Sequence, residues 1–142
     1  ADVVLPNITE ASFLLGIEYR PENYSKDYIE NICAGLLKLG AKNAVLTGVS
    51  FEKDKLGVAV CDGKSVEYYF TEKLPVQMHG TGDVFASAFT GSVCRGKSLL
   101  ESAKIAANYV VESIKATIDD KDHWYGVKFE KAIPYLVKEL EK

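Results

Sequence analysis

The sequence is poor in the residues that build metal centres and disulfide frameworks. It has three cysteines and two histidines in 142 residues. Cys33, Cys61 and Cys94 lack the paired spacing of zinc ligands, and an odd number of cysteines does not indicate a disulfide framework. We therefore expect reduced, buried thiols in a cytosolic protein. With only His79 and His123 available, a metal site built from several histidines is not expected.

Long apolar runs and strong net charge are also missing. No run approaches the roughly 18 apolar residues that cross a bilayer, and no stretch at the start resembles a signal peptide. The formal net charge of −3 gives no electrostatic reason to expect binding to nucleic acid or to an anionic membrane. A hydrophobic fraction of 47% with 26% charged residues is typical of one soluble globular domain, which we expect to be cytoplasmic.

An initiator methionine is absent as well. The chain opens with Ala1 and Asp2 and continues at once into the apolar residues 3–5. Because domains usually begin at an exposed polar end, we expect these residues to be the later part of a longer protein.

The first elements that the sequence predicts are a short strand and a capped helix. Residues 3–5 are an apolar run that ends at a proline. Asn7, with Glu10 three residues later, is a variant of the capping box and predicts a helix over residues 8–15. Gly16 is a typical residue just beyond a helix end.

A second helix and a second strand follow. Apolar residues keep helical spacing between Ser25, a candidate cap, and Gly40. Residues 43–47 then predict a strand that Gly48 closes. A strand, a helical connection and another strand form a βαβ unit, which favours a parallel pair with a right-handed crossover.

The middle of the sequence predicts a hairpin. Residues 56–61 and 65–70 have strand composition and are joined around Asp62-Gly63, a strong hairpin signal. The sheet is therefore expected to gain antiparallel strands at one side. Residues 71–78 show little periodicity and are expected to form a loop.

The second half of the sequence is helical in pattern. A tightly packed helix over residues 84–93 is expected to end at Gly96, and Ser98 with Glu101 forms a capping box for a helix over about residues 99–117. Residues 119–125 are a charged loop that holds Trp124, and a last helix is expected over about residues 129–140. Pro134 fits that helix only near its first turn. The fold class is α/β, a mixed sheet covered by helices.

Between the hairpin and the first of these helices lies His79-Gly80-Thr81-Gly82-Asp83. Its two glycines permit close backbone approach to a ligand, and the start of a helix presents free N–H groups that suit a phosphate. Asp83 then falls in the first helical turn, beside any bound anion. Its carboxylate is either a base for a hydroxyl that attacks phosphorus, or an acid favoured there only by the helix dipole.

A second glycine-containing segment matches the P-loop pattern, but the strands that a P-loop requires around it are not predicted. Residues 91–98 fit G-x-x-x-x-G-K-[ST]. A P-loop requires a preceding strand and a later strand ending in an acid, whereas residues 83–90 have helical spacing. Gly96 as a helix end and Ser98 as a helix cap explain the same letters without a nucleotide.

Taken together, these segments resemble the ribokinase-like superfamily, and within it the pyridoxal/pyridoxamine kinases. The resemblance is carried by the Asn-x-x-Glu segment at residues 7–10 after a strand, by the strand that ends in Thr47-Gly48, and by the Gly-Thr-Gly-Asp turn at residues 80–83. The tail from Tyr125 to Pro134 is also similar to the closing helix of bacterial members. The resemblance implies a three-layer sheet with helices on both faces. It covers residues 1–142 as the C-terminal, nucleotide-binding half of such a kinase, whose N-terminal half is absent.

The resemblance also implies a role for each of these residues. Asp83 would be the base that accepts the hydroxyl proton, and the amides of Gly80, Thr81 and Gly82, with that of Asp83, would form an anion hole. Thr47, Gly48 and Asn7 would contact the nucleotide. Glu10 would act on magnesium through water, although a capping box explains Asn7 and Glu10 equally well. His79 and Trp124 are expected to be structural.

The implied reaction transfers the γ-phosphoryl group of ATP to the 5′-hydroxymethyl group of pyridoxal, pyridoxine or pyridoxamine. ATP and Mg²⁺ would be required, a monovalent cation is a further candidate, and the full-length protein would be a homodimer. The related hydroxymethylpyrimidine phosphate kinases tend to carry cysteine at the position of Asp83, which favours the pyridoxal branch. Hydroxymethylpyrimidine or sugar kinase activity stays an alternative, as does an inactive structural or assembly fragment.

Overall fold

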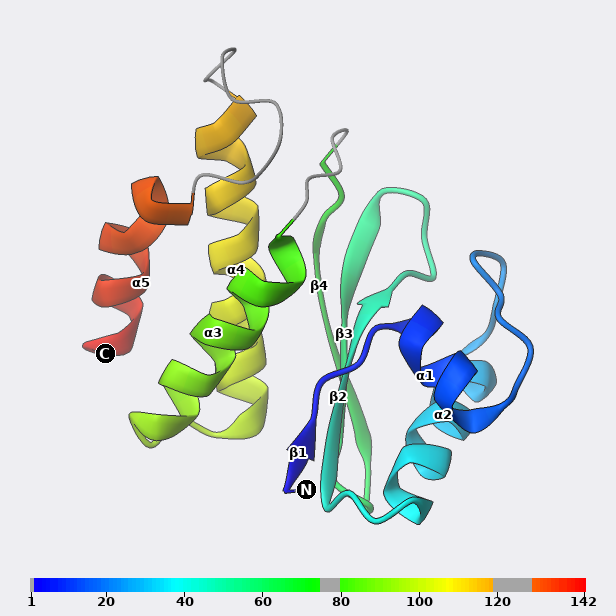
Figure 1. The fold of residues 1–142 in the computed structure, drawn as a ribbon. Helices are drawn as coiled ribbons and strands as arrows, with labels where there is room; N and C mark the ends of the chain where they lie inside the picture. The colour runs from blue at the N-terminus through cyan, green and yellow to red at the C-terminus, as the bar shows by residue number, and fades with distance from the viewer. Residues whose placement is uncertain (1, 75–79, 119–128) are drawn as a thin grey trace. The chain divides into compact units, whose positions relative to one another are not determined.

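The computed structural model describes residues 2–74, 80–118 and 129–142 (Figure 1). The chain divides into two compact units, Ala1–Lys73 and Leu74–Lys142, and each is described here by itself. The predictions for His79, His123, Trp124 and Tyr125 lie outside the described residues. None of the described helices is long and apolar enough to cross a membrane.

The first unit is built on a mixed four-stranded sheet in the order β1-β2-β3-β4. β1 (Val3–Val4) pairs in parallel with β2 (Asn43–Val49), which confirms the predicted βαβ unit. β3 (Lys55–Cys61) and β4 (Val66–Glu72) are antiparallel neighbours, which confirms the hairpin. β2 runs two residues beyond its predicted end. Thr71 and Glu72, predicted as loop, belong to β4, because they pair with Leu56 and Lys55 of β3.

Two helices connect the parallel strands. α1 (Ile8–Leu15) has Asn7 as its N-cap and ends at Gly16, whose φ of 67° is left-handed, so both predicted boundaries are confirmed. α2 (Lys26–Lys38) begins after Ser25, as predicted, although the Ser25 side chain makes no capping hydrogen bond.

The core of the first unit lies between α2 and the sheet. α2 turns a stripe of apolar side chains inward, and alternate residues of β2 and β3 face it. The fully buried members include Ile29, Ile32, Leu36, Ala44, Leu46, Val49 and Ala59. This agrees with the helical spacing and the strand alternation in the sequence.

The cysteines differ from expectation. Cys33 of α2 and Cys61 of β3 are joined by a disulfide across this core, with Cα atoms 6.2 Å apart. Cys94 is free, but exposed rather than buried. The prediction of three reduced, buried thiols was therefore wrong. Pairing depends on the register of α2 against the sheet, which an odd cysteine count with a separation of 28 residues does not reveal.

The second unit is helical in its described part. α3 (Thr81–Cys94) and α4 (Leu99–Ile118) pack against each other, and α4 also contacts η1 (Phe129–Ala132) and α5 (Ile133–Leu140). The predicted last helix is thus a 3-10 turn followed by a short α-helix, with Pro134 in the first turn as required. Two buried hydroxyls bond within their own helices: Ser92 of α3 and Ser113 of α4 each donate to a carbonyl four residues earlier, at 2.7 and 2.8 Å.

Residues 91–98 form a junction between helices, which confirms that their P-loop letters are a coincidence. They span the end of α3, a turn at Gly96 with φ of 86°, and the approach to α4. The Oγ of Ser98 accepts a hydrogen bond from the amide of Glu101 at 3.1 Å. No strand precedes the segment within described residues 80–90.

Candidate functional site

The carboxyl ends of β1 and β2 bring together two of the predicted site residues. The amide of Thr47 donates to the carbonyl oxygen of Pro6 at 3.0 Å. Asn7 and Thr47 form an isolated parallel bridge beyond the end of β1. Residues from segments forty positions apart in the sequence are therefore backbone neighbours at one end of the sheet. In open α/β sheets this is the end at which ligands bind.

Gly48 marks a break in β2. The pairing register with β3 shifts between Thr47 and Val49, and Gly48 has a φ of 76°, a left-handed value that disfavours any side chain. This is a β-bulge, a feature common beside active sites because it redirects the strand. The bulge also returns Val49 to the α2 side of the sheet, where it joins Leu46 in the core.

The residues that follow the bulge are fixed by hydrogen bonds. The hydroxyl oxygen of Tyr24 accepts from the amide of Ser50 at 2.7 Å, and burial raises the pKa of this tyrosine. The Ser50 hydroxyl lies 2.8 Å from the carbonyl of Glu52 and 2.7 Å from that of Lys55, to which it can donate. These hydrogen bonds anchor the residue two positions after Gly48.

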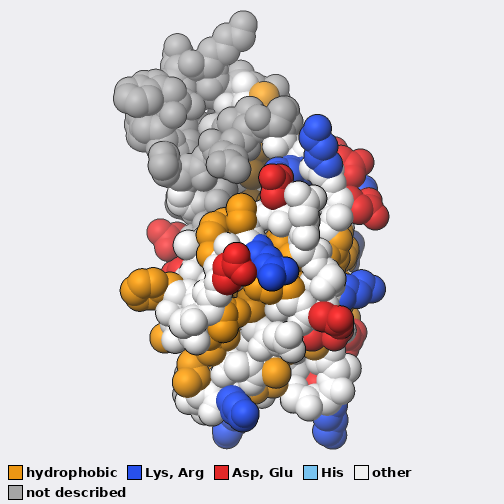
Figure 2. Space-filling view, turned by 90° about the vertical axis from the view of Figure 1, so that its right-hand side faces the viewer, with side chains coloured by type: hydrophobic (Ala, Val, Ile, Leu, Met, Phe, Trp, Pro, Cys, Tyr) orange, Lys and Arg blue, Asp and Glu red, His pale blue; other side chains and the backbone are white. Residues whose placement is uncertain are grey.

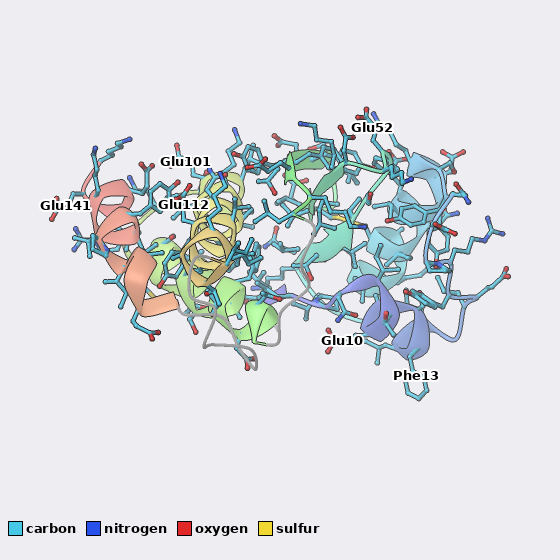
Figure 3. The ribbon with its side chains drawn as sticks, turned by 90° about the horizontal axis from the view of Figure 1, so that it is seen from above. Glu10, Phe13, Glu52, Glu101, Glu112 and Glu141 are labelled. Carbon is cyan, nitrogen blue, oxygen red and sulfur yellow. A yellow bond between two sulfur atoms is a disulfide. The ribbon has the colours of Figure 1, made fainter. Side chains whose placement is uncertain are left out.

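Asn7 and Glu10 form a complete capping box. The Oδ1 of Asn7 accepts from the amide of Glu10 at 2.7 Å, and the Oε1 of Glu10 accepts from the amide of Asn7 at 3.0 Å. Both side chains are exposed, and Glu10 lies at the start of α1 in Figure 3. The two residues therefore have a structural task, and any ligand contact would be additional to it. The second carboxylate oxygen of Glu10 is open to such a contact.

The start of α3 carries the remaining predicted residues. Gly80 is the N-cap with a φ of 87°, and it provides no capping side chain. Thr81, Gly82 and Asp83 form the first turn. In any α-helix the first N–H groups are not used by the helix's own i→i−4 hydrogen bonds. A Cβ at Gly80 or Gly82 would meet nothing within 4 Å. The glycines are therefore not required by packing within the described residues.

Asp83 is exposed in this first turn, and no hydrogen bond or ion pair involves its carboxylate within the described part of the chain. A carboxylate in the first turn, close to the amides at the start of α3, matches both hypotheses for this residue. It can serve as a base close to a bound anion, or interact only with the helix dipole, worth about 0.3–1 kcal/mol.

The structure thus gives two groups of site residues, one in each unit. Asn7, Glu10, Thr47 and Gly48 lie together in the first unit, and residues 80–83 form a single turn in the second. The bulge at Gly48 was not foreseen, because a glycine after a strand also fits a simple strand end. No group of three His, Cys, Asp or Glu residues that could hold a metal occurs in the described ranges.

Comparison with known proteins gives one consistent family. Residues 1–127 match the family model described as phosphomethylpyrimidine kinase. The chain is 30% identical over 115 residues to the hydroxymethylpyrimidine/phosphomethylpyrimidine kinase of Aquifex aeolicus, covering 80% of this chain and 44% of that protein.

Solved structures agree with this result. Pyridoxal kinase from Lactobacillus plantarum is similar with a TM-score of 0.83 and 30% identity, over 97% of this chain and 50% of that one. Pyridoxal kinase from Staphylococcus aureus in complex with AMP-PCP and pyridoxal is similar with a TM-score of 0.71 and 28% identity, over 81% and 42%. The chain spans about half the length of the relatives it matches.

Proposed function

Because the chain belongs to the phosphomethylpyrimidine kinase family, we propose that it is the C-terminal, nucleotide-binding half of an ATP-dependent kinase that phosphorylates a hydroxymethyl group. The proposed acceptor is the 5′-hydroxymethyl group of pyridoxal, pyridoxine or pyridoxamine. Residues 80–83 form the anion hole in this proposal, and Asp83 is the base.

The observation that carries the proposal is the turn at the start of α3. Gly80 caps α3 without a side-chain hydrogen bond, and the carboxylate of Asp83, which has no hydrogen bond or ion pair within the described residues, stands in the first turn. Phosphoryl transfer needs positioned donors for the charge on the phosphoryl oxygens and a group that accepts the hydroxyl proton. In this proposal the amide of Gly82 is such a donor, and the carboxylate of Asp83, in the same turn, accepts the proton.

The nucleotide would also contact the carboxyl end of β2. Thr47 lies beside Asn7 there, and the bulge at Gly48 removes side-chain bulk from the strand end. The Staphylococcus aureus relative was solved with AMP-PCP, an ATP analogue, which supports ATP as the donor.

The chain's own residues fit magnesium held chiefly by water and by phosphate oxygens. Glu10 is exposed and has one carboxylate oxygen outside the capping box. Mg²⁺ keeps several waters and needs few protein carboxylates. When bound, the metal would neutralise charge on the phosphates, and Glu10 would hold one of its waters. A monovalent cation remains a further candidate.

Hydroxymethylpyrimidine or its phosphate is the second candidate acceptor, and the Aquifex aeolicus relative favours it by its name. Asp83 favours the pyridoxal branch, because cysteine is expected at this position in the pyrimidine branch. A sugar is a further candidate acceptor. Turnover by the complete enzyme with pyridoxal and with hydroxymethylpyrimidine, each over a concentration series, decides between them by the ratio of kcat/KM values.

The base assignment is tested by Asp83→Asn in the complete enzyme. We expect kcat to fall by about 100- to 10,000-fold, the range for loss of a general base. Asp27→Asn is the matched control, because Asp27 is likewise the acidic residue in the first turn of a helix, α2. An Asp83→Asn enzyme with nearly normal kcat would leave only the dipole role.

Nucleotide binding is tested on the 142-residue chain itself. Saturating Mg-ATP should raise its melting temperature, since a ligand at 100 times its Kd adds about 2.7 kcal/mol to the free energy of unfolding. Thr47→Val should reduce this rise, whereas Thr90→Val, at an exposed position of α3, should not. A melting temperature that is the same with and without Mg-ATP would favour the alternative hypothesis, an assembly fragment without a nucleotide site.

Two features of the complete protein extend this proposal. We propose a homodimer, checked by light scattering of the complete enzyme, and a cytoplasmic location, checked by cell fractionation. The cysteines had indicated the cytosol because all three were expected to be reduced. Since Cys33 and Cys61 form a disulfide, that argument no longer applies, and the proposed location rests on the family alone.

A further inference from the structure

The connection between α1 and α2 turns one side chain into the protein. Residues 16–23 and 25–27 are exposed, whereas Tyr24 between them is only 8% exposed. Figure 2 looks onto the side of the molecule that carries these two helices, where charged side chains interrupt the hydrophobic ones. Loops normally run over such a surface, so the burial of one loop tyrosine needs an explanation.

The backbone before Tyr24 has an uncommon conformation. Asn23 has a φ of 59°, in the left-handed region, and it is the one non-glycine residue with a positive φ in the described part of the chain. Asparagine tolerates this region better than most residues do. The loop thus adopts a conformation that few residues favour, directly before the side chain that is buried.

The hydroxyl of Tyr24 reaches the segment that follows β2. Its oxygen accepts a hydrogen bond from the amide of Ser50 at 2.7 Å, across 26 positions of the sequence. Its ring centroid lies 5.9 Å from that of Phe51 and 5.3 Å from that of Tyr28. Tyr24 therefore joins the α1–α2 connection to the residues that directly follow the bulge.

Tyr28 fixes the connection to α2. Its hydroxyl donates to the carbonyl oxygen of Glu18 at 2.8 Å and accepts from the amide of Arg20 at 3.1 Å. The guanidinium carbon of Arg20 also lies 5.6 Å from the centre of the Tyr28 ring. The hydroxyl of Tyr24 is thus presented by a loop that is itself bonded to a core helix.

The two residues proposed to contact the nucleotide, Thr47 and Gly48, lie between two backbone anchors. The amide of Thr47 donates to the carbonyl oxygen of Pro6 at 3.0 Å, and that of Ser50 donates to Tyr24. Gly48 between them is exposed with a φ of 76°, and a glycine leaves such a conformation at little steric cost. Restraint on this segment therefore comes from its ends. A segment that is already ordered loses less entropy when a ligand binds.

We propose that Tyr24 is a positioning residue for the nucleotide site. Through the amide of Ser50 it holds the end of β2 in the conformation that binds ATP, and it does not touch the ATP itself, because its ring belongs to the core on the α2 side of the sheet. The proposal rests on the proposed function, in which Thr47 and Gly48 contact the nucleotide. A tyrosine that served only the core would affect stability but not the KM for ATP.

Tyr24→Phe in the complete enzyme removes the hydrogen-bond acceptor and keeps the ring. We expect the KM for ATP to rise by about 3- to 10-fold, the range for the loss of one hydrogen bond. With the better of pyridoxal and hydroxymethylpyrimidine as the acceptor, kcat and the KM for that alcohol should stay within about twofold. Loss of binding that is equal in the ground state and the transition state raises KM alone.

Tyr68→Phe is the matched control. Tyr68 of β4 belongs to the same aromatic group, with its ring centroid 5.5 Å from that of Phe51. Its buried hydroxyl makes no hydrogen bond within the described residues. The substitution thus removes the same atom without the loss of a hydrogen bond, and the KM for ATP should not change. An equal rise of this KM in both variants would mean that the aromatic rings act through packing alone, and would overturn the proposal.

Hydrogen exchange of the wild-type enzyme gives a test that needs no variant. The amide of Ser50 should be protected without ligand by about 10-fold or more relative to an unstructured chain. Saturating Mg-ATP should change this protection by less than about 10-fold, because the segment already has its bound conformation. An unprotected amide, or one that Mg-ATP protects by about 100-fold or more, would show that Tyr24 does not order the segment and would overturn the proposal.

Phosphoryl transfer by the wild-type enzyme separates the two possible failures. A wild-type enzyme that transfers no phosphoryl group from ATP to either alcohol would overturn the proposed function, and the role of Tyr24 with it. A wild-type enzyme that turns over, with the same KM for ATP as Tyr24→Phe, would overturn the role of Tyr24 and leave the proposed function standing.

Discussion

Gly57 shows at the scale of one residue how closely β3 and β4 approach. An added Cβ would overlap the carbonyl oxygen of Tyr69 and lie 2.9 Å from the Cα of Phe70. Both are backbone atoms of the paired strand, so no rotation of a side chain can relieve the contact.

Gly57→Ala is therefore expected to lower the free energy of unfolding by about 1–3 kcal/mol, the range for overpacking, in urea titrations. Gly91→Ala is the matched control. It lies inside α3 with nothing within 4 Å of the added methyl group, and alanine is favoured over glycine there by up to about 1 kcal/mol. Equal effects of the two substitutions would contradict the close approach.

Asp62 stabilises the hairpin turn through its charge. Its carboxylate accepts from the amides of Lys64 at 2.9 Å and Ser65 at 3.0 Å, and these hydrogen bonds hold the pKa of Asp62 below its ordinary value. Gly63 takes the next position with a φ of 90°. The sequence signal Asp-Gly thus works through a side-chain bond as well as through the freedom of glycine.

A depressed pKa fixes the direction of the pH effect. The contribution of Asp62 to stability is complete above its unfolded pKa of about 3.9 and is lost as the pH falls through the lower folded value. An NMR titration of the side chain should give a midpoint below 3.9. Asp62→Asn keeps an acceptor but should remove this acid-dependent part of stability; a midpoint at or above 3.9 would contradict the assignment.

At the scale of elements, α1 depends on its capping box. The reciprocal bonds between Asn7 and Glu10 satisfy two backbone amides that a helix start leaves open. The same two residues are proposed for the ligand site, so effects on folding must be separated from effects on binding.

Asn7→Ala should lower the free energy of unfolding by about 1 kcal/mol, measured without ligand. Asn7→Asp retains a capping oxygen and should restore most of that stability. If Asn7 also contacts the nucleotide, Asn7→Asp will still reduce the rise in melting temperature that Mg-ATP produces, because the new charge faces phosphate. An unchanged rise would mean that Asn7 acts only as a helix cap.

At the scale of the molecule, the Cys33–Cys61 disulfide joins α2 to the sheet across a separation of 28 residues. Reduction should lower the free energy of unfolding by about 3–4 kcal/mol through the loop closed in the unfolded chain. Urea titrations with and without a reductant measure this, and Cys94→Ser, at the free cysteine, should change nothing. Alkylation of all three cysteines in unreduced, denatured protein would show that the disulfide is absent.

The sequence by itself determined the features that depend on a few neighbouring residues. The capping box at Asn7, the end of α1 at Gly16, the turn at Asp62 and the glycine start of α3 all follow from local hydrogen bonding and backbone freedom. The same local rules identified residues 91–98 as a helix junction. These predictions succeeded because each interaction joins residues at most five positions apart.

Only the tertiary structure decided what depends on pairing between distant segments. The disulfide follows from the register of α2 against β3, the bulge at Gly48 from the pairing of β2 with β3, and the bridge between Asn7 and Thr47 from the parallel crossover. The position of β1 at the end of the described sheet order has the same origin, since residues 3–5 have the composition of an interior strand. Contacts between distant segments depend on how whole elements pack, and the spacing of residues along the chain does not record that packing.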